Sequence, residues 1–300
     1  MNDKADSQST QLQTRIARED TIRTQHAKAE LKIYNLKQLN KKHSINVLKQ
    51  KLNEKEITSK TAATMVTYWN RVAEYACKPD LYISAKEYGL NAGGFSYTDR
   101  TVSKESHRAF VSYLEEQYQL TGDIRYKALK LSVELQRELG LRASESFCIK
   151  LAEKDISNEK LHLDRKDDTK NGRERDVPIW KPSQKEKLEE AQRFVKEQGW
   201  TSLIPPEYTK SQWISFTYGT VVEFKNKVPE HREYHFHGER HAFAQEYYQH
   251  LKEQRLEEKI RESEDKALAL TRDEEREIRK EVSEALGHSR EEITWTYIGK

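Results

Sequence analysis

Cysteine is almost absent from this sequence: the 300 residues contain only two, Cys77 and Cys148. Two thiols cannot form a disulfide framework, and they do not supply the Cys and His set of a structural zinc site. The sequence therefore excludes the small disulfide-rich classes. It fits a reducing compartment, and we expect a cytoplasmic protein.

Long apolar runs are absent as well. Hydrophobic residues make up 35% of the chain and charged residues 34%, and the mean hydropathy is -1.00. No segment approaches the roughly 20 apolar residues of a membrane span, and the N-terminus lacks a signal-peptide core. This composition predicts about two domains built from long, half-exposed helices, with no membrane association.

The net charge is only +3, but it is unevenly distributed. Residues 1–95 contain 16 Lys and Arg against 10 Asp and Glu, whereas the remainder contains 37 against 40. A positive excess in the N-terminal third can meet DNA phosphates, although charge alone fits a solvated basic helix face equally well.

Hydrophobic pattern and the positions of Gly and Pro divide the N-terminal third into three segments. Residues 1–24 are polar and predict a disordered tail, residues 25–95 predict a helical domain, and residues 96–102 predict a linker. The clearest helix begins at Ser59 and ends before Pro79. Its polar face holds three candidate DNA-binding residues, Lys60, Arg71 and Lys78.

Four short segments carry a set of ionisable side chains in the rest of the chain. They are G-L-R-A-S-E (140–145), T-K-N-G-R-E-R-D-V-P (169–178), H-G-E-R-H (237–241), and L-G-H followed by a Tyr (286–297). In chain order the candidate residues are Arg142, Glu145, Lys170, His237, Arg240, His288 and Tyr297. This set suits attack on a phosphodiester without a metal or another cofactor.

Chemistry explains each residue type in the set. A phosphate on its way to a pentacoordinate state gathers charge on its non-bridging oxygens, and the planar guanidinium groups of Arg142 and Arg240 can clamp them. Tyr297 can act as a covalent nucleophile, and a Lys on a flexible hairpin can protonate the departing oxygen. Two imidazoles can bind the phosphate and manage the phenol proton. Glu145, one helical turn beyond Arg142, can orient a neighbouring group.

In their order, and in the nine-residue interval from His288 to Tyr297, these segments resemble the motif boxes of the tyrosine recombinases, the integrases of phages and other mobile elements. The resemblance covers roughly residues 103–300. It implies a helical core-binding domain and a catalytic domain that close around duplex DNA as a clamp. The expected fold is mostly α with a small antiparallel β-sheet (α+β).

The resemblance also implies site-specific DNA recombination without metal or ATP. Tyr297 forms a 3′-phosphotyrosyl bond, Lys170 protonates the leaving 5′-oxygen, and the other residues of the set bind or support the phosphate. The implied partners are specific double-stranded DNA sites, a homotetramer on DNA and an accessory directionality factor. Two other classes stay open: a type IB topoisomerase with a similar Arg, Lys and Tyr set, and a DNA-binding protein without enzymatic activity.

Helical periodicity and capping signals indicate how the motifs are held. We expect a helix that opens at Ser103 and a second over residues 125–139, which Gly140 ends just before the first Arg. Capping boxes at Ser183 and Thr271 predict the starts of two further helices.

A change of period between these helices predicts strands. Apolar residues alternate over 147–151, 161–163 and 177–179, which indicates a small antiparallel sheet. The polar turn between the last two strands places Lys170 beside the hairpin tip. Lys166 is the alternative acid, and two ordinary loop lysines are the other interpretation.

Four of the ten His lie between His231 and His241, which makes a metal site the alternative interpretation of that motif. No Cys is near, and Arg232 and Arg240 would repel a cation. We therefore expect no metal there.

Residues 252–272 depart from the family pattern, because a nearly all-charged stretch lengthens the interval between the second Arg and L-G-H. The ends of such an insertion must lie close together, so we expect an out-and-back helical excursion. Only three residues follow Tyr297, where many relatives carry a segment that packs on the neighbouring protomer. We therefore hypothesise that the insertion helps to assemble the multimer; a solvated helix is the alternative.

Overall fold

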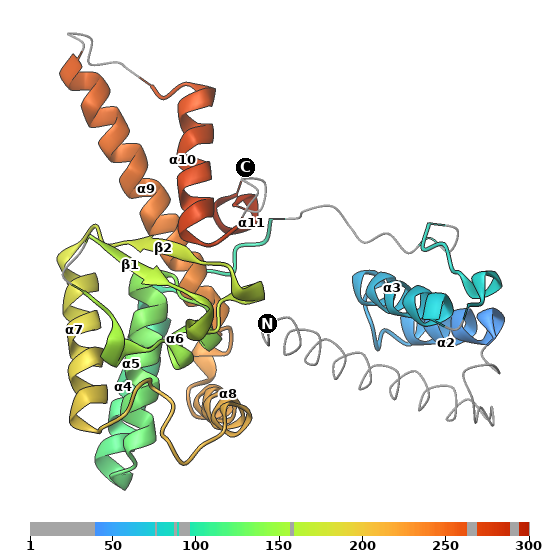
Figure 1. Cartoon of the computed structure of the whole chain (residues 1–300), viewed down its shortest axis with the longest axis horizontal. Coiled ribbons are helices and arrows are strands. Elements are labelled where there is room, and N and C mark those ends of the chain that lie inside the picture. Colours follow the sequence, from blue (N-terminus) through green and yellow to red (C-terminus); the bar gives the residue numbers. More distant parts are fainter. Residues whose placement is uncertain are drawn as a thin grey trace, which may run out of the picture. The chain divides into compact units, whose positions relative to one another are not determined.

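The computed structural model describes residues 40–75, 77–86, 89, 97–156, 159–262, 269–288 and 294–299. These residues are mostly helical with one two-stranded antiparallel sheet, so the predicted fold class is confirmed (Figure 1). They fall into two compact units, one up to residue 94 and one from residue 95 onward. The predicted tail and the first residue of the predicted linker lie outside the described residues. None of the described helices is long and apolar enough to cross a membrane.

The described part of the unit up to residue 94 contains the helices α2 (Lys41–Asn53) and α3 (Ser59–Tyr75). The apolar residues of α3 form a buried stripe in a small core that the helix shares with α2, and Trp69 in this stripe is 3% exposed. The side-chain amide of Asn70 accepts the N–H of Ile83 at 2.8 Å and donates to its carbonyl at 2.9 Å. These bonds hold the segment after α3 against the helix.

The unit from residue 95 onward is a group of helices with the small sheet on one side. Figure 1 shows α9 and α10 extending together away from the other helices. In chain order its helices and strands are α4 (Lys104–Thr121), α5 (Ile124–Leu139), α6 (Ala143–Cys148), β1 (Lys160–Leu163), β2 (Arg175–Pro178), α7 (Pro182–Glu197), α8 (Lys210–Lys227), α9 (Phe236–Glu262), α10 (Arg272–Ala285) and α11 (Trp295–Ile298).

Three helix ends agree with the local sequence signals. Ser103 caps α4, and Gly140 ends α5 in the left-handed conformation with a φ of 60°. Thr271 and Glu274 form the capping box of α10, in which each side chain accepts the other residue's backbone N–H. Each signal acts within about one turn of the chain, which is why the sequence alone predicted these three helix ends.

The start of α7 was predicted wrongly. Its cap is Lys181 rather than Ser183, and Gln184 supplies the returning side chain, accepting the Lys181 N–H at 3.0 Å. Pro182 occupies the first helical position, where its fixed φ and missing N–H carry no penalty. The proline therefore sets the boundary before the expected Ser–Glu pair can act.

The sheet consists of β1 and β2, which pair antiparallel with Leu161 opposite Val177. The further strand expected over residues 147–151 is wrong: Phe147 lies in α6, and a 3-10 turn follows at Leu151–Glu153. These apolar residues are buried without strand pairing. Three alternating positions are too few to separate a strand from the end of a buried helix.

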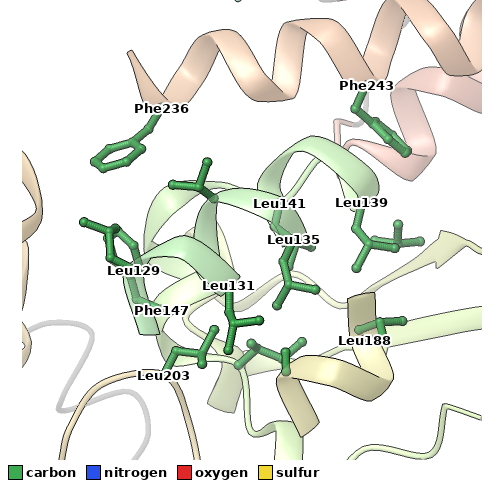
Figure 2. Close-up of a cluster of buried hydrophobic side chains, with 14 of the residues drawn as sticks. Leu129, Leu131, Leu135, Leu139, Leu141, Phe147, Leu188, Leu203, Phe236 and Phe243 are labelled. Atoms are coloured by element: carbon green, nitrogen blue, oxygen red, sulfur yellow. The ribbon is translucent and has the colours of Figure 1, made fainter. Parts of the chain in front are cut away.

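The core of this unit is centred on α5, which packs against α4, α6, α7 and α9. Figure 2 shows Leu135 and Leu139 of α5 among side chains from neighbouring elements, including Phe147 and Phe243. All four side chains are at most 1% exposed, and burying each contributes on the order of 1.5–3 kcal/mol. The packing fixes the junction between α5 and α6, where the first Arg motif lies.

A buried ionic network fixes the start of α9, which carries the H-G-E-R-H motif. The carboxylate of Glu239 is fully buried and lies 3.0 Å from Nδ1 of His107 in α4 and 3.5 Å from Nη1 of Arg137 in α5. Arg137 also donates to the carbonyl of Val102 at 2.8 Å and pairs with Glu246 at 3.1 Å. Three helices are thereby held in one arrangement.

The charged stretch after residue 251 continues α9 as far as Glu262, and α10 returns beside it. Three pairs among the described residues join the helices: Lys259 Nζ lies 2.8 Å from Glu274, Lys252 Nζ lies 3.4 Å from Glu275, and Arg255 Nη2 lies 3.4 Å from Glu281. Partly exposed ion pairs of this kind contribute little stability each, about 0–1 kcal/mol. The part of the predicted insertion at 263–268 lies outside the described residues.

Candidate active site

Arg142 and Glu145 stand at the start of α6, directly after the chain turns at Gly140. The backbone N–H of Arg142 donates to Oε2 of Glu145 at 2.7 Å, and its Nη1 donates to Oε1 at 2.6 Å. A side chain at position 140 would collide with the ring of Phe243, so the turn needs glycine for space as well as for its positive φ. The turn, the cap and the salt bridge together fix the Arg142 guanidinium.

The carboxylate of Glu145 is the centre of a buried cluster of charges. It is 0% exposed and receives both Nη1 and Nη2 of Arg175, at 2.7 and 2.8 Å, while Nη1 of Arg240 lies 3.9 Å away. Burial alone would raise the pKa of Glu145, but Arg175, Arg240 and Arg142 outweigh it and lower the pKa to about 2. Glu145 is therefore ionised near neutral pH and holds three guanidinium groups around it.

Arg175 is a site residue that the sequence analysis missed. It lies on β2 and donates from Nε to the carbonyl of Ala285 at 3.1 Å. Its side chain crosses Gly287, where a Cβ would lie 2.7 Å from Cδ of the arginine. Arg175 and Val177 are two residues apart on β2, so both side chains point to the buried face of the strand. A charged residue at a position predicted to face the core is the signal that could have identified Arg175.

Arg240 is fully buried on α9 and donates from Nη1 to the carbonyl of Gly140 and from Nη2 to that of Leu286. Its Nε has no hydrogen-bond partner among the described residues. Burial, and after it the charges of Arg142 and Arg175, lower the pKa of Arg240 to about 10, although Tyr297 and Glu145 act in the opposite direction. The group remains a cation at neutral pH, with a buried donor available to an anion.

Tyr297 lies in α11 with its side chain turned into the protein, and the residue is 4% exposed. Its hydroxyl oxygen is 3.3 Å from Nε2 of His288. Its ring centroid is 4.5 Å from that of His241 and 5.7 Å from that of His237, and the guanidinium carbon of Arg240 is 5.9 Å from it. The structure thus brings together residues from the last two motifs of the chain.

The three imidazoles around the phenol are all poor bases in this environment. Burial is the first cause in each case, followed by neighbouring cations or histidines, and it lowers the pKa of His288 to about 3 and those of His237 and His241 to about 4. The side chain of His237 is nevertheless exposed at the surface, so it is the one of the three that solvent reaches most easily. At neutral pH all three rings are uncharged, and His288 becomes a proton acceptor only when a nearby anion, such as a bound phosphate, raises its pKa.

His241 was part of a recognised motif but was not named as a site residue. It is 3% exposed, and its Nδ1 has no hydrogen-bond partner among the described residues. Its position, four residues after His237 on α9, places both rings on one helix face toward Tyr297. That spacing is the signal that could have added it to the set.

Lys170 is exposed in a 3-10 turn (Lys170–Gly172) within the connection between β1 and β2. It is close enough to His288 for its charge to help lower the pKa of that ring. Lys166, the alternative acid, is also exposed but is not among the groups that shift it. The role of Lys170 as the acid, with Lys166 as the alternative, stays a prediction.

A cleft of about 310 Å³ opens where Arg142, His237 and Arg240 converge. Its other wall is largely apolar and includes Phe147 and Tyr218, the latter 52% exposed. Within the described ranges, no three His, Cys, Asp or Glu side chains are placed to hold a metal ion.

The candidate DNA-binding residues belong to the other unit. Lys60 and Arg71 are exposed on α3, and Lys78 is partly buried after its end. Lys60 and Arg71 lie three helical turns apart on α3, on the side opposite its buried stripe. Their role stays a prediction.

Comparison with known proteins shows what the chain is similar to. Residues 99–246 match the family model described as Integrase, whereas no curated protein sequence matches the chain. The structure is similar to that of the Tn1549 transposon integrase in complex with transposon right-end DNA, with a TM-score of 0.56 and 14% identity over 95% of this chain and 88% of that one.

Two further solved structures share the fold. The XerH site-specific recombinase, in a pre-cleavage complex with its difH substrate, gives a TM-score of 0.51 and 15% identity over 88% of this chain and 68% of that one. A lambda integrase tetramer bound to a Holliday junction gives a TM-score of 0.54 and 14% identity over 96% of this chain and 71% of that one. Residues 99–246 thus match the integrase family model, and the resemblance to the tyrosine recombinases is confirmed.

Proposed function

We propose that this protein is a site-specific DNA recombinase or integrase that cleaves and rejoins strands through a 3′-phosphotyrosyl intermediate. One observation carries the proposal: the Tyr297 hydroxyl lies 3.3 Å from Nε2 of His288 and its ring lies beside the buried guanidinium of Arg240. A nucleophile, a proton acceptor and a cation at one place are what attack on a phosphodiester requires. The family match and the DNA-bound complexes of the same fold support this reaction class.

In this mechanism the scissile phosphate enters the cleft between Arg142, His237 and Arg240. The buried Nε of Arg240 and the remaining N–H groups of Arg142 donate to its non-bridging oxygens, where charge accumulates in the transition state. Water is largely excluded around Arg240, so each of these hydrogen bonds is stronger than it would be on an open surface. No metal ion is needed to supply positive charge.

The proton steps follow from the protonation states. Tyr297 gives its proton toward neutral His288 as its oxygen bonds to phosphorus, and the bond from phosphorus to the 5′-oxygen breaks. Lys170 protonates that leaving oxygen, so a free 5′-hydroxyl results. The incoming phosphate is negative and favours the protonated imidazole that forms. Rejoining reverses these steps with a partner strand, and ATP is not needed because the phosphotyrosyl ester conserves the bond energy.

The proposed partner is double-stranded DNA carrying specific recombination sites. The unit up to residue 94 forms the second half of a clamp, and Lys60, Arg71 and Lys78 contact phosphates from it. Four protomers act on two duplexes, as suggested by the lambda integrase tetramer on a Holliday junction. The Tn1549 integrase supports an origin in a mobile element, for which an accessory directionality factor and a cytoplasmic location are expected.

The deciding experiment traps the covalent intermediate on a nicked suicide substrate. The unsubstituted chain is expected to form a protein–DNA adduct in the presence of EDTA. Tyr297→Phe should abolish the adduct while leaving duplex binding within about threefold, because only the nucleophilic oxygen is lost. Tyr248→Phe removes a hydroxyl from α9 away from the cluster and should behave as the unsubstituted chain.

Four outcomes contradict the proposal or part of it. An adduct formed by Tyr297→Phe rules out this nucleophile, and cleavage that stops in EDTA and returns with magnesium rules out a metal-independent reaction. Relaxation of supercoils by a monomer without strand exchange indicates the type IB topoisomerase class. Binding without any adduct from the unsubstituted chain leaves a non-enzymatic DNA-binding protein.

A further inference from the structure

Arg175 takes no part in the steps above, yet its side chain joins three elements that carry them. From β2, just after the connection that holds Lys170, it donates two hydrogen bonds to Glu145 and one to the carbonyl of Ala285. The two bonds to Glu145 form the paired fork that only a guanidinium can make. The third hydrogen bond goes to Ala285 at the end of α10, two residues before Gly287. The chain continues from there to His288.

The carbonyl of Leu286, next to Ala285, is where two other arginines meet. This oxygen accepts Nη2 of Arg240, and Nη2 of Arg142 lies 3.4 Å from it. The position of this carbonyl depends on the segment that Arg175 holds from the other side. Both phosphate-binding arginines of the proposed mechanism are therefore oriented partly through contacts that Arg175 maintains.

Glu145 would act differently if Arg175 were lost. Its buried carboxylate would keep its contacts with Arg142, and the nearest other cation is Arg240, 3.9 Å away. A buried carboxylate without sufficient partners attracts any guanidinium within reach. Arg142 and Arg240 would then turn toward Glu145 and away from an incoming phosphate.

We propose that Arg175 is a positioning residue for DNA cleavage, which saturates Glu145 and anchors the segment from Ala285 to His288. In this role it keeps Arg142, Arg240 and the His288–Tyr297 pair in the geometry that attack requires, without contacting DNA. Its Nε, Nη1 and Nη2 already donate to Ala285 and Glu145, whereas the Nε of Arg240 has no partner among the described residues, so we assign phosphate binding to Arg240 and positioning to Arg175. The inference rests on the proposed recombinase function.

The first test compares duplex affinity with the single-turnover cleavage rate at saturating DNA for Arg175→Gln and Arg175→Lys. Cleavage by Arg175→Gln is expected to fall by about 100-fold, the loss typical of small displacements of catalytic groups, while affinity changes by less than about threefold. Arg175→Lys keeps the charge but cannot supply three fixed donors, so it should remain at least about tenfold slow. Arg173→Gln removes the same charge from an exposed position of the same hairpin and is the matched control for the rate.

The route through Glu145 is tested with a double-variant cycle. If Arg175 acts through this carboxylate, the double variant Glu145→Gln/Arg175→Gln should cleave no more slowly than Glu145→Gln alone. Multiplying effects would mean that the two residues act independently, and the proposal would be overturned. An equal loss of affinity and rate in Arg175→Gln would also overturn it, because that pattern indicates DNA contact. Full activity of Arg175→Lys would show that charge alone suffices.

A second measurement does not depend on catalysis. The amides of Leu286, Gly287 and His288 donate to the carbonyls of Val282, Glu284 and Ser283. Hydrogen exchange at these three amides should accelerate by about tenfold in Arg175→Gln, but not in Arg173→Gln, while exchange in α4 and α5 stays unchanged. Unchanged exchange at these amides would refute the anchoring role. Failure of the recombinase function would appear instead as an unsubstituted chain that never forms a covalent adduct.

Discussion

Glu145→Gln should make the unfolding free energy of this protein less dependent on pH, by an amount that the structure sets. The carboxylate is fully buried, and its pKa is lowered from an ordinary 4.5 to about 2. A carboxylate whose pKa is depressed by folding stabilises the native state above its unfolded-state pKa, and the contribution is lost as pH falls through the folded value. Since one pKa unit corresponds to about 1.4 kcal/mol, the contribution is about 3 kcal/mol at pH 7.

The assay is urea unfolding of both chains at a series of pH values, followed by tryptophan fluorescence. The unsubstituted chain should exceed Glu145→Gln by about 3 kcal/mol or more above pH 5, and roughly half of the pH-dependent gap should remain near pH 3. The histidines with depressed pKa values titrate in both chains, so their effect cancels in the difference. A gap that is constant with pH, or that widens on acidification, would refute the assignment of Glu145 as an ionised hub.

Two further predictions concern the hairpin lysine and the extended helix pair. Lys170→Ala should slow cleavage by about 10²–10⁴-fold, the range for a lost general acid, while Lys166→Ala should not; a 5′-bridging sulfur in the substrate should restore the rate, and no rescue would mean that Lys170 binds phosphate instead. Replacing residues 252–272 by a short Gly/Ser linker should spare cleavage of a single site and weaken synapsis of two sites, because the pair extends away from the catalytic cluster. Unchanged synapsis in a gel-shift assay would identify it as a solvated decoration.

Much of the fold was predictable because its signals are local. Ser103, Gly140 and the Thr271–Glu274 pair act within a single turn of chain, and the structure has each of them where the sequence placed it. The four motifs could be recognised by order and spacing without any knowledge of their contacts. The prediction for the start of α7 was wrong because Pro182 was a stronger local signal than the Ser183–Glu186 pair on which the prediction rested.

The contacts between the motifs could not be predicted from the sequence. Arg175 meets Glu145 across 30 residues and Ala285 across 110, and no local pattern specifies either partner. His241 reaches Tyr297 only because α11 folds back onto α9. Residue types can indicate which chemistry is present, but the depressed pKa values arise from burial and neighbouring charges, which exist only in the folded protein.

The L-G-H motif illustrates how a recognised pattern acquires a physical explanation. The carbonyl of Leu286 orients Arg240, the missing side chain of Gly287 makes room for Arg175, and the ring of His288 meets the phenol of Tyr297. Each position therefore serves a different partner. The role of Gly287 is easiest to test apart from catalysis, because in the proposed mechanism this glycine makes room for Arg175 and takes no part in the chemical steps.

Gly287→Ala should consequently be much more damaging than a matched glycine substitution. Gly287 and Gly122 have the same φ of 68°, but a Cβ at position 122 meets nothing within 4 Å, whereas at 287 it would lie 2.7 Å from Cδ of Arg175. Both substitutions incur the left-handed penalty of about 1–2 kcal/mol, and only Gly287→Ala adds about 1–3 kcal/mol of overpacking. Thermal unfolding and single-turnover cleavage should therefore separate the two variants. Equal effects would mean that the close approach of Arg175 to Gly287 does not constrain the site.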